Sequence, residues 1–242
     1  FSAISMCIMF TQTHIQVNAT ALLQSVKNIA LEQDRYDSML KLDINQPTDS
    51  FYYDAWQLKP EYSTPEWLTL FDQLGPVGQA KIVSIPPGTS YHAHSDIEDR
   101  YHITLQSDHS YLIDLEQCEM YATQVDNVCY HMDTARIHTA VNFGYQDRIQ
   151  LVVRQLLNRP QLNHVSHVHL RPRVLDEPYN QRNLFDQHIL TWLNTANKRR
   201  ILDNFDPKGE DVEIEFDLES SHVKELQHQI TLCGFDILCD IT

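Results

Sequence analysis

The feature that most restricts the fold is a run of short segments, beginning at Ala80, in which apolar and polar residues alternate. Turn-forming residues separate most of these segments, among them Pro86-Pro87-Gly88 and Asp126-Asn127. We count eight strand candidates: AKIVSIP, YHAHSD, YHITLQS, SYLIDLE, MYATQV, VCYHMD, IHTAVNF and RIQLVVRQL. Several short strands at this spacing predict a β-sandwich or barrel rather than an alternation of parallel strands and helices. Eight strands that close on themselves are typical of a jelly roll.

The residues before this run predict two helices with strands between them. Asn18 is a good N-cap for a helix from about Ala19 to Gln33, because its side chain accepts hydrogen bonds from free N–H groups of the first turn. Thr64-Pro65-Glu66 predicts the start of a second helix, which ends at Gly75. The strand-like stretches MLKLDI and SFYYDAWQL lie between the two helices.

The residues after Leu157 predict a smaller region of mixed structure. Residues 158–178 show little periodicity and indicate an irregular connection. The remaining segments predict, in order, a helix at 183–194, a second helix at 199–205, the strand DVEIEFDL, the helix HVKELQHQITLC and the strand FDILCDI.

We therefore expect a mainly β protein with flanking helices. Its core is a double-stranded β-helix (jelly-roll, cupin-like), followed by a small α+β C-terminal region. The expected parts are residues 1–79 (helices and strands that pack on the barrel), 80–157 (the catalytic core) and 158–242 (the C-terminal accessory region).

Charge and composition limit the partners. The 242 residues include 18 Lys and Arg against 33 Asp and Glu, a net charge of −15, which argues against a nucleic-acid surface with clustered cations. No apolar run approaches the roughly 18–20 residues needed to cross a bilayer, so no membrane partner is expected. Five cysteines without a C-x-x-C pair suit a reducing compartment, and we expect a cytoplasmic protein. The first residue is Phe, and Met9 is a plausible natural start.

Two histidines and an aspartate within the run form a candidate metal site. His94 and Asp96 lie two positions apart on an expected strand and therefore project to one face, and His138 begins another expected strand. One carboxylate and two imidazoles can occupy one face of an octahedral Fe(II) and leave the other face open. In a chain with 13 histidines a His-x-Asp is a weak signal, and surface or loop histidines are the alternative. His92 competes with His94, which we prefer because Asp96 completes its motif.

Arg148 strengthens this interpretation. It lies ten positions after His138, in the eighth expected strand, and so is expected to enter the same barrel. An Arg that points into an apolar barrel needs an anionic partner, and a carboxylate suits its planar fork. A small dicarboxylic co-substrate satisfies both sites, with one end on the iron and the other on Arg148.

Residues 80 to 155 resemble the Fe(II)/2-oxoglutarate dioxygenases, and among them the aspartyl/asparaginyl β-hydroxylase-like group, which includes bacterial proline hydroxylases. The features of that group that match here are a Pro-Gly turn before the first ligand, an Arg-x-His after it, an Asp before the distal His, and an Asn and an Arg after it: Pro87-Gly88, Arg100-Tyr101-His102, Asp133, Asn142 and Arg148. A serine that contacts the co-substrate in this group is matched by Ser84 only with a shift of one position.

The resemblance implies that His94, Asp96 and His138 hold Fe(II). It also implies that Arg148, Arg100, His102 and Asn142 bind the co-substrate 2-oxoglutarate. With O2, and with ascorbate as a supporting reductant, such an enzyme hydroxylates an unactivated C–H bond and releases succinate and CO2. We expect a small-molecule substrate, a free amino acid or a small derivative of one. The alternatives are a peptidyl Asp/Asn hydroxylase and a non-catalytic cupin-like metal- or ligand-binding barrel. The oligomeric state stays open.

Overall fold

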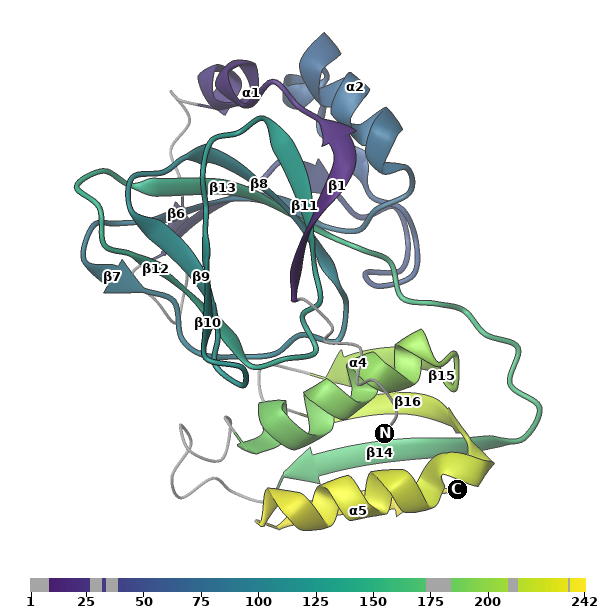
Figure 1. The fold of residues 1–242 in the computed structure, drawn as a ribbon. Coiled ribbons are helices and arrows are strands. Elements are labelled where there is room, and N and C mark those ends of the chain that lie inside the picture. The colour runs from purple at the N-terminus through teal and green to yellow at the C-terminus, as the bar shows by residue number, and fades with distance from the viewer. Residues whose placement is uncertain (1–8, 27–31, 34–38, 173–183, 209–212, 235) are drawn as a thin grey trace, which may run out of the picture.

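The structure is a computed structural model that describes residues 9–26, 32–33, 39–172, 184–208, 213–234 and 236–242. The question of whether residues 1–8 are native lies outside these ranges. Figure 1 shows a β-barrel with two helices, α1 and α2, on its outside and a smaller α+β region beneath it in this view. In the described part of the chain, every helix is too short or too polar to span a membrane.

Two antiparallel sheets form the barrel. The larger sheet has seven strands in the order β1 (Phe10–Gln16), β11 (Val128–Met132), β8 (Arg100–Gln106), β13 (Arg148–Arg154), β6 (Ala80–Ile85), β3 (Leu40–Asp43) and β2 (Glu32–Gln33). The smaller sheet has four strands in the order β10 (Glu119–Ala122), β9 (Ser110–Asp114), β12 (His138–Asn142) and β7 (Thr89–Ser90). From β6 to β13 the chain crosses repeatedly between the sheets, which confirms the predicted jelly-roll core.

The alternating sequence pattern explains how the sheets are covered. On β6, Val83 and Ile85 face the space between the two sheets, where they pack with Leu112 of β9. Ile82, the neighbour between them, belongs to a second cluster with Trp67 of α2 (Pro65–Leu74). A strand that is apolar on both faces is thus buried on both, by the opposite sheet inside and by helices outside. The helices on the outer side are α1 (Ala19–Val26) and α2.

The prediction of a second strand at YHAHSD is wrong, because these residues do not form a regular strand. Only Thr89–Ser90 is a strand, and the next residues keep an isolated bridge between His94 and His138. Tyr91 N–H donates to the Ala140 carbonyl at 2.8 Å and His94 N–H to the His138 carbonyl at 3.0 Å. The chain advances by three residues from Tyr91 to His94, whereas the opposite strand β12 advances by only two, from His138 to Ala140. One extra residue interrupts the ladder, as in a β-bulge, a feature that is frequent beside active sites.

Two expectations for the N-terminal part also need correction. Glu32–Gln33, the expected end of the first helix, are a strand because they pair with Leu40 and Lys41 of β3. In SFYYDAWQL only Gln57–Leu58 is a strand (β5), paired with β4 (Asn45–Gln46). The Asp54 carboxylate accepts a hydrogen bond from Ser50 N–H at 3.0 Å and closes a turn there. The second helix ends at Gly75 as predicted. A short helix, η1 (Pro60–Tyr62), precedes it.

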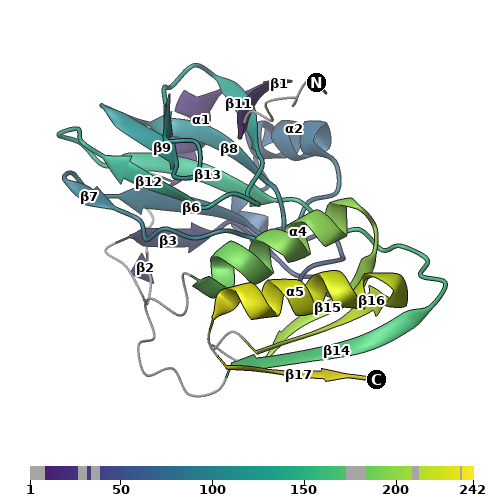
Figure 2. The same cartoon turned by 60° about the horizontal axis from the view of Figure 1, so that its bottom comes forward.

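The C-terminal region is a four-stranded sheet with helices on one face (Figure 2). The strand order is β15 (Leu202–Lys208), β16 (Glu213–Glu219), β14 (Val165–Pro172) and β17 (Ile237–Ile241). The helical elements are η2 (Asp186–Leu190), α4 (Thr191–Lys198), η3 (Ser220–His222) and α5 (Val223–Cys233). On β16, Ile214, Phe216 and Leu218 are buried and alternate with acidic residues, so the apolar side of this sheet faces the helices.

Two segments of this region differ from expectation. Val165–Pro172 is a strand within the expected irregular connection, because Val168 and Leu170 enter the core while β16 and β17 bind its two edges. Leu202–Lys208 is a strand and not a helix, since it pairs with β16 and has a register shift between Asp203 and Asp206. The expected helix at 183–194 is described from residue 184 and runs on to Lys198, with one π-helical turn.

Candidate active site

Three side chains that are far apart in the sequence meet inside the barrel. His94 and Asp96 come from the bulged segment after β7, and His138 is the first residue of β12. Asp96 Oδ2 lies 3.5 Å from His94 Nε2 and 3.8 Å from His138 Nε2. The candidate ligand atoms all lie within 4.8 Å of one another. Among the described residues, these three side chains form the one group of three or more His, Cys, Asp or Glu residues that is close enough to hold a metal ion.

The two imidazoles are oriented by the backbone. His94 Nδ1–H donates to the carbonyl of His92 at 3.0 Å, and His138 Nδ1–H donates to the carbonyl of Arg136 at 2.8 Å. Each bond uses one ring nitrogen and leaves the Nε2 lone pair directed at the other ligands. Burial lowers the pKa of His138 to about 3, so its ring is neutral at physiological pH. The His138 ring is thus in the state that binds a metal ion.

Asp96 provides the carboxylate. Although burial alone raises its pKa, the Arg100 guanidinium, which is hydrogen-bonded to Oδ1, and His94 hold the pKa well below its usual range. The second oxygen, Oδ2, is buried and has no hydrogen-bond partner among the described residues. This oxygen and the two Nε2 atoms are three acceptors with no donor between them. Because unpartnered buried acceptors are costly, the donor set fits a cation.

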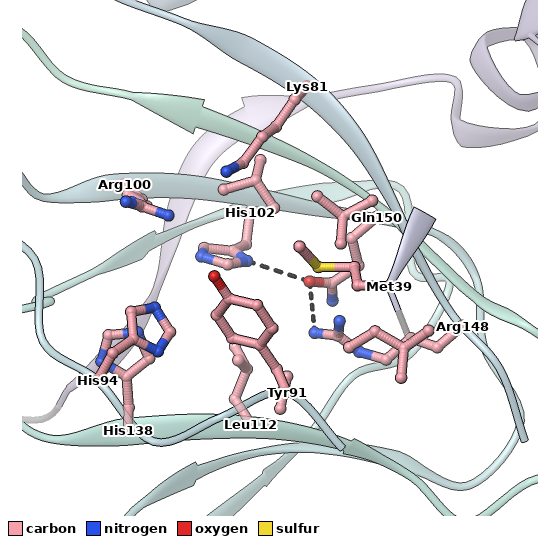
Figure 3. A pocket seen from close by; sticks show the side chains of 14 residues that line it. Met39, Lys81, Tyr91, His94, Arg100, His102, Leu112, His138, Arg148 and Gln150 are labelled. Atoms are coloured by element: carbon pink, nitrogen blue, oxygen red, sulfur yellow. Dashed lines mark hydrogen bonds between the residues drawn. The ribbon is translucent and has the colours of Figure 1, made fainter. Parts of the chain in front are cut away.

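A cavity extends from this group into the barrel. Its lining comes mainly from the facing strands of the two sheets, and Figure 3 shows the side chains. The lining residues are Met39, Lys81, Val83, Ile85, Tyr91, His94, Arg100, His102, Leu112, His138, Ala140, Arg148, Gln150 and Val152.

Arg148 lines the cavity and is buried, with 2% of its surface exposed. Its Nη2 donates to Gln150 Oε1 at 2.5 Å, and its Nε has no partner in the described part of the chain. Burial lowers the pKa of Arg148 to about 9, which leaves it protonated at neutral pH, and no described carboxylate acts on it. The guanidinium is therefore a buried cation that has no anionic partner among the described residues.

His102 extends the polar wall of the cavity. Its Nδ1–H donates to the same Gln150 Oε1 at 3.1 Å, and the Gln150 amide donates to Thr104 Oγ1 at 3.1 Å. Burial lowers the pKa of His102 to about 3, so the ring is neutral, and its Nε2 is buried without a partner among the described residues. Gln150 thus couples Arg148 and His102 into one wall.

Comparison with protein families gives a match over residues 12–156, more than half of the chain, to aspartyl/asparaginyl beta-hydroxylase. The chain belongs to the aspartyl/asparaginyl beta-hydroxylase family. This membership confirms the predicted enzyme class, a dioxygenase that uses Fe(II), 2-oxoglutarate and O2. The donor set described above fits that metal.

Comparison with solved structures finds similarity to the crystal structure of an oxidoreductase of the 2OG-Fe(II) oxygenase family from Burkholderia pseudomallei. The TM-score is 0.42 and the identity 13%, over 56% of this chain and 76% of that chain. No curated protein sequence gives a significant match.

Asn142, which was expected to bind the co-substrate, lies outside the cavity lining, and so does Ser84, which matches the family's serine only with a shift of one position. Asn142 is fully buried at the end of β12, where its amide donates to the carbonyls of Ile85 and Gln146 at 2.9 and 2.8 Å and accepts from Gly144 N–H at 3.0 Å. These bonds give it a structural role at the strand end. Ser84 is buried, and its hydroxyl has no partner among the described residues, but it does not line the cavity.

Sequence reasoning missed Lys81, Tyr91 and Gln150 as cavity residues of this hydroxylase. The alternation of β13 contained the signal for Gln150, because residues 148, 150 and 152 project to one face. Lys81 pairs in register with Val152 of the same strand. Burial, followed by the nearby Arg100, lowers the pKa of Lys81 to about 8. Its position on a strand next to β13 was not evident without the sheet order.

Proposed function

We propose that His94, Asp96 and His138 bind Fe(II) and that 2-oxoglutarate occupies the adjoining cavity with its distal carboxylate on Arg148. One observation carries this proposal. A single cavity is lined at one side by His94 and His138 and at the other by a buried guanidinium without a described acidic partner. A dicarboxylate that reaches from the metal to Arg148 satisfies both.

The side chains around the cavity have separate tasks in this proposal. Arg100 keeps Asp96 ionised and oriented, and the two backbone carbonyls keep the imidazoles aimed at the metal. Neutral His102 and the Lys81 amine add polar groups beside the co-substrate, and apolar side chains form much of the remaining lining. When bound, Fe(II) activates O2 with electrons from the oxidative decarboxylation of 2-oxoglutarate, so that a substrate C–H bond is hydroxylated and succinate and CO2 are released.

We infer that the substrate is a free amino acid or a small amino-acid derivative. The C-terminal region supports this inference because it lies directly against the segment that carries His94 and Asp96. Asn194 of α4 donates to the Asp96 carbonyl at 3.1 Å, and Ser95 Oγ donates to the Asp186 carbonyl at 2.8 Å. A wall at this position reduces the space for a folded protein substrate and suits a small one.

A peptidyl Asp or Asn is the second candidate substrate. The observation that favours it is the family match, whose description names an aspartyl/asparaginyl beta-hydroxylase. An extended peptide can enter a site that a folded domain cannot reach. The two candidates differ in the length of substrate that the enzyme accepts.

A succinate assay with Fe(II), ascorbate and 2-oxoglutarate tests the site, and a screen of amino acids and of Asp- and Asn-containing peptides tests the substrate. We expect a free amino acid or derivative to gain the mass of one oxygen and to stimulate succinate formation. Stimulation by peptides alone would transfer the proposal to the second candidate. His138→Ala is expected to abolish succinate formation at limiting iron, whereas His109→Ala, in a turn outside the cavity, is not. Full activity of His138→Ala would refute the metal site.

A further inference from the structure

We propose that α4 of the C-terminal region positions the Asp96 ligand, with Asn194 as the central contact. The proposal rests on the iron site proposed above. Its starting point is a difference among the three ligands. His94 and His138 fix each other through two backbone hydrogen bonds, at 3.0 and 2.9 Å, within the barrel. Asp96 lies beyond this bridge, in a segment without strand structure, so other contacts must hold it.

Asn194 supplies such a contact from outside the barrel. Its side chain is fully buried, and its Nδ2 donates to the backbone carbonyl of Asp96 at 3.1 Å. The same amide lies 3.3 Å from Asp99 Oδ1 and 3.4 Å from Thr134 Oγ1. Thr134 in turn accepts the Asp96 N–H at 3.0 Å through its carbonyl. Asn194 therefore joins the loop that carries Asp96 to the loop that leads into His138.

A second residue of the same helix holds the same two loops. Lys198 lies one turn after Asn194, and its Nζ is 2.9 Å from Asp99 Oδ1 and 2.8 Å from Asp133 Oδ1. Residues four apart on a helix share a face, so α4 presents both side chains to the loops. The contact with Lys198 also gives Asp133 a structural role, because it links the loop that contains Asp133 to the C-terminal region.

The residues on either side of Asp96 are held by the C-terminal region as well. Ser95 Oγ donates to the carbonyl of Asp186, at the start of η2. Ile97 is buried in the hydrophobic cluster of the C-terminal region, together with Phe185 and Ile189, rather than in the barrel. The ligand segment is therefore built into the core of the C-terminal region. That region lies beyond the family match, which ends at residue 156, so this support belongs to the chain's own C-terminal part.

This arrangement makes metal affinity depend on α4. Loss of the Asn194 amide leaves the Asp96 carbonyl without this donor and frees the segment to shift, while the two histidines keep their bridge. Removal of groups that orient metal ligands typically weakens metal binding by about 10–100-fold. We expect an effect of that size from Asn194→Ala, and a smaller one from loss of the more exposed Lys198 contact.

Binding of Mn(II), a redox-inert probe, tests the proposal without turnover. The free ion is measured by electron paramagnetic resonance as full-length protein is added. Asn194→Ala is compared with Asn197→Ala, a matched control on the same helix. Asn197 is also buried, but its Oδ1 accepts from Asn158 N–H at 2.8 Å in the connection to the C-terminal region. We expect about 10-fold or greater weakening for Asn194→Ala alone, with similar losses of thermal stability in both variants.

Asp96→Ala in the same titration separates the two proposals. Equal Mn(II) affinity of Asp96→Ala and the unchanged protein, or no binding by either, would refute the iron site and this inference together. Weak binding by Asp96→Ala with equal affinities of Asn194→Ala and Asn197→Ala would overturn the positioning role alone.

Lys198→Gln carries the test if Asn194→Ala does not fold. Its control is Arg199→Gln, because Arg199 pairs with Glu225 inside the C-terminal region at 2.7 Å. We expect Lys198→Gln to weaken Mn(II) binding about two- to fivefold, as for a partly exposed ion pair, and Arg199→Gln to leave it unchanged. Equal affinities of these two variants would overturn the role of α4.

Discussion

Two arginines at opposite ends of β13 show how one strand serves both stability and ligand binding. Arg148 and Arg154 are both buried, with 2% and 6% of their surfaces exposed. Arg154 has its Nε 3.6 Å from the Glu98 carboxylate, donates to the Phe51 carbonyl at 2.7 Å and lies over the Phe51 ring at 4.0 Å. Arg148 has the neutral side chain of Gln150 and no described carboxylate.

The difference separates a structural cation from one that is prepared for a ligand. A buried charge is costly unless a partner compensates it within the fold. Arg154 is compensated by Glu98 and by the aromatic residues of the loop at 51–56, which fasten the barrel to that loop. Arg148 contacts the polar wall, but no carboxylate in the described part of the chain compensates its charge. We infer that the protein accepts this cost because the co-substrate provides the missing carboxylate.

The largest expected effect is the loss of stability from Arg154→Met. The change leaves Glu98 buried with Arg100, 3.4 Å away, as its described ion-pair partner. Removal of one partner from a buried ion pair costs about 3–5 kcal/mol, and the remaining contact places the expectation near the lower end. Denaturant unfolding of the metal-free protein measures it. If Arg154→Met instead bound 2-oxoglutarate more weakly and kept its stability, the contrast between a structural Arg154 and a ligand-binding Arg148 would be wrong.

Arg148→Met is expected to show the opposite behaviour. The variant removes an uncompensated buried charge, so the metal-free protein should be as stable as the unchanged protein or more stable. Removal of one partner of a buried charged pair costs about 2–5 kcal/mol of binding, and a loss near the lower end of that range corresponds to about 100-fold weaker 2-oxoglutarate binding. Calorimetric titration of the Mn(II)-loaded protein measures this. Undiminished 2-oxoglutarate affinity, or weakened Mn(II) binding, would contradict the assignment of Arg148.

Gln150→Glu converts Arg148 into a site that resembles Arg154. The new carboxylate lies where Oε1 now accepts from Arg148 at 2.5 Å, so the guanidinium gains an internal anion. We expect higher thermal stability and about 10-fold weaker 2-oxoglutarate binding, because the internal acid competes with the co-substrate. Gln150→Leu, which removes the hydrogen bonds without adding charge, is the control. Tighter co-substrate binding in Gln150→Glu would show that Arg148 is not the anion site.

The sequence was sufficient to predict those features that depend on a local pattern of residues. The period of two predicted seven of the eight core strands, and the His-x-Asp spacing led to His94 and Asp96. It was not sufficient for features that depend on non-local contacts. The bulge at His94 arises from its register against β12, and the strand at Leu202–Lys208 is fixed by pairing with β16.

The same limit applies to the cavity. Asn142 matches a family position, yet its bonding to the strand end follows from where Ile85 and Gln146 lie. Lys81 carries no motif, and only the register between β6 and β13 brings it to the cavity wall. Sequence alone therefore identified the charged residues near the candidate metal motif, Arg100 and Arg148, and missed Lys81, which comes from the neighbouring strand β6.

Lys81 provides the smallest expected effect and the finest test of the comparison. Burial, followed by Arg100, lowers its pKa to about 8, so the amine loses its charge as the pH rises through that value. If the cavity uses the charge to attract a dianion, kcat/KM for 2-oxoglutarate is level below about pH 8 and falls a few-fold above it, since kcat/KM reports the free enzyme. Lys81→Met is expected to have a lower value that does not fall near pH 8 and falls only nearer pH 9, where Arg148 loses its charge.

The free energy of unfolding is expected to change with pH in the opposite direction to kcat/KM, because of the same residue. Because the folded pKa lies below the unfolded value of about 10.4, the unfolded chain binds more protons between these pH values, and the stability of the metal-free protein rises with pH there. Lys81→Met should remove the part of that rise that begins near pH 8, while the part from Arg148, which begins near pH 9, remains. The amine would then resemble Arg148, a charge that costs stability in the empty cavity and contributes to binding of the anion. A kcat/KM profile of the unchanged protein that shows no fall near pH 8 and has the same shape as that of Lys81→Met would instead assign Lys81 to structure, as Arg154 is.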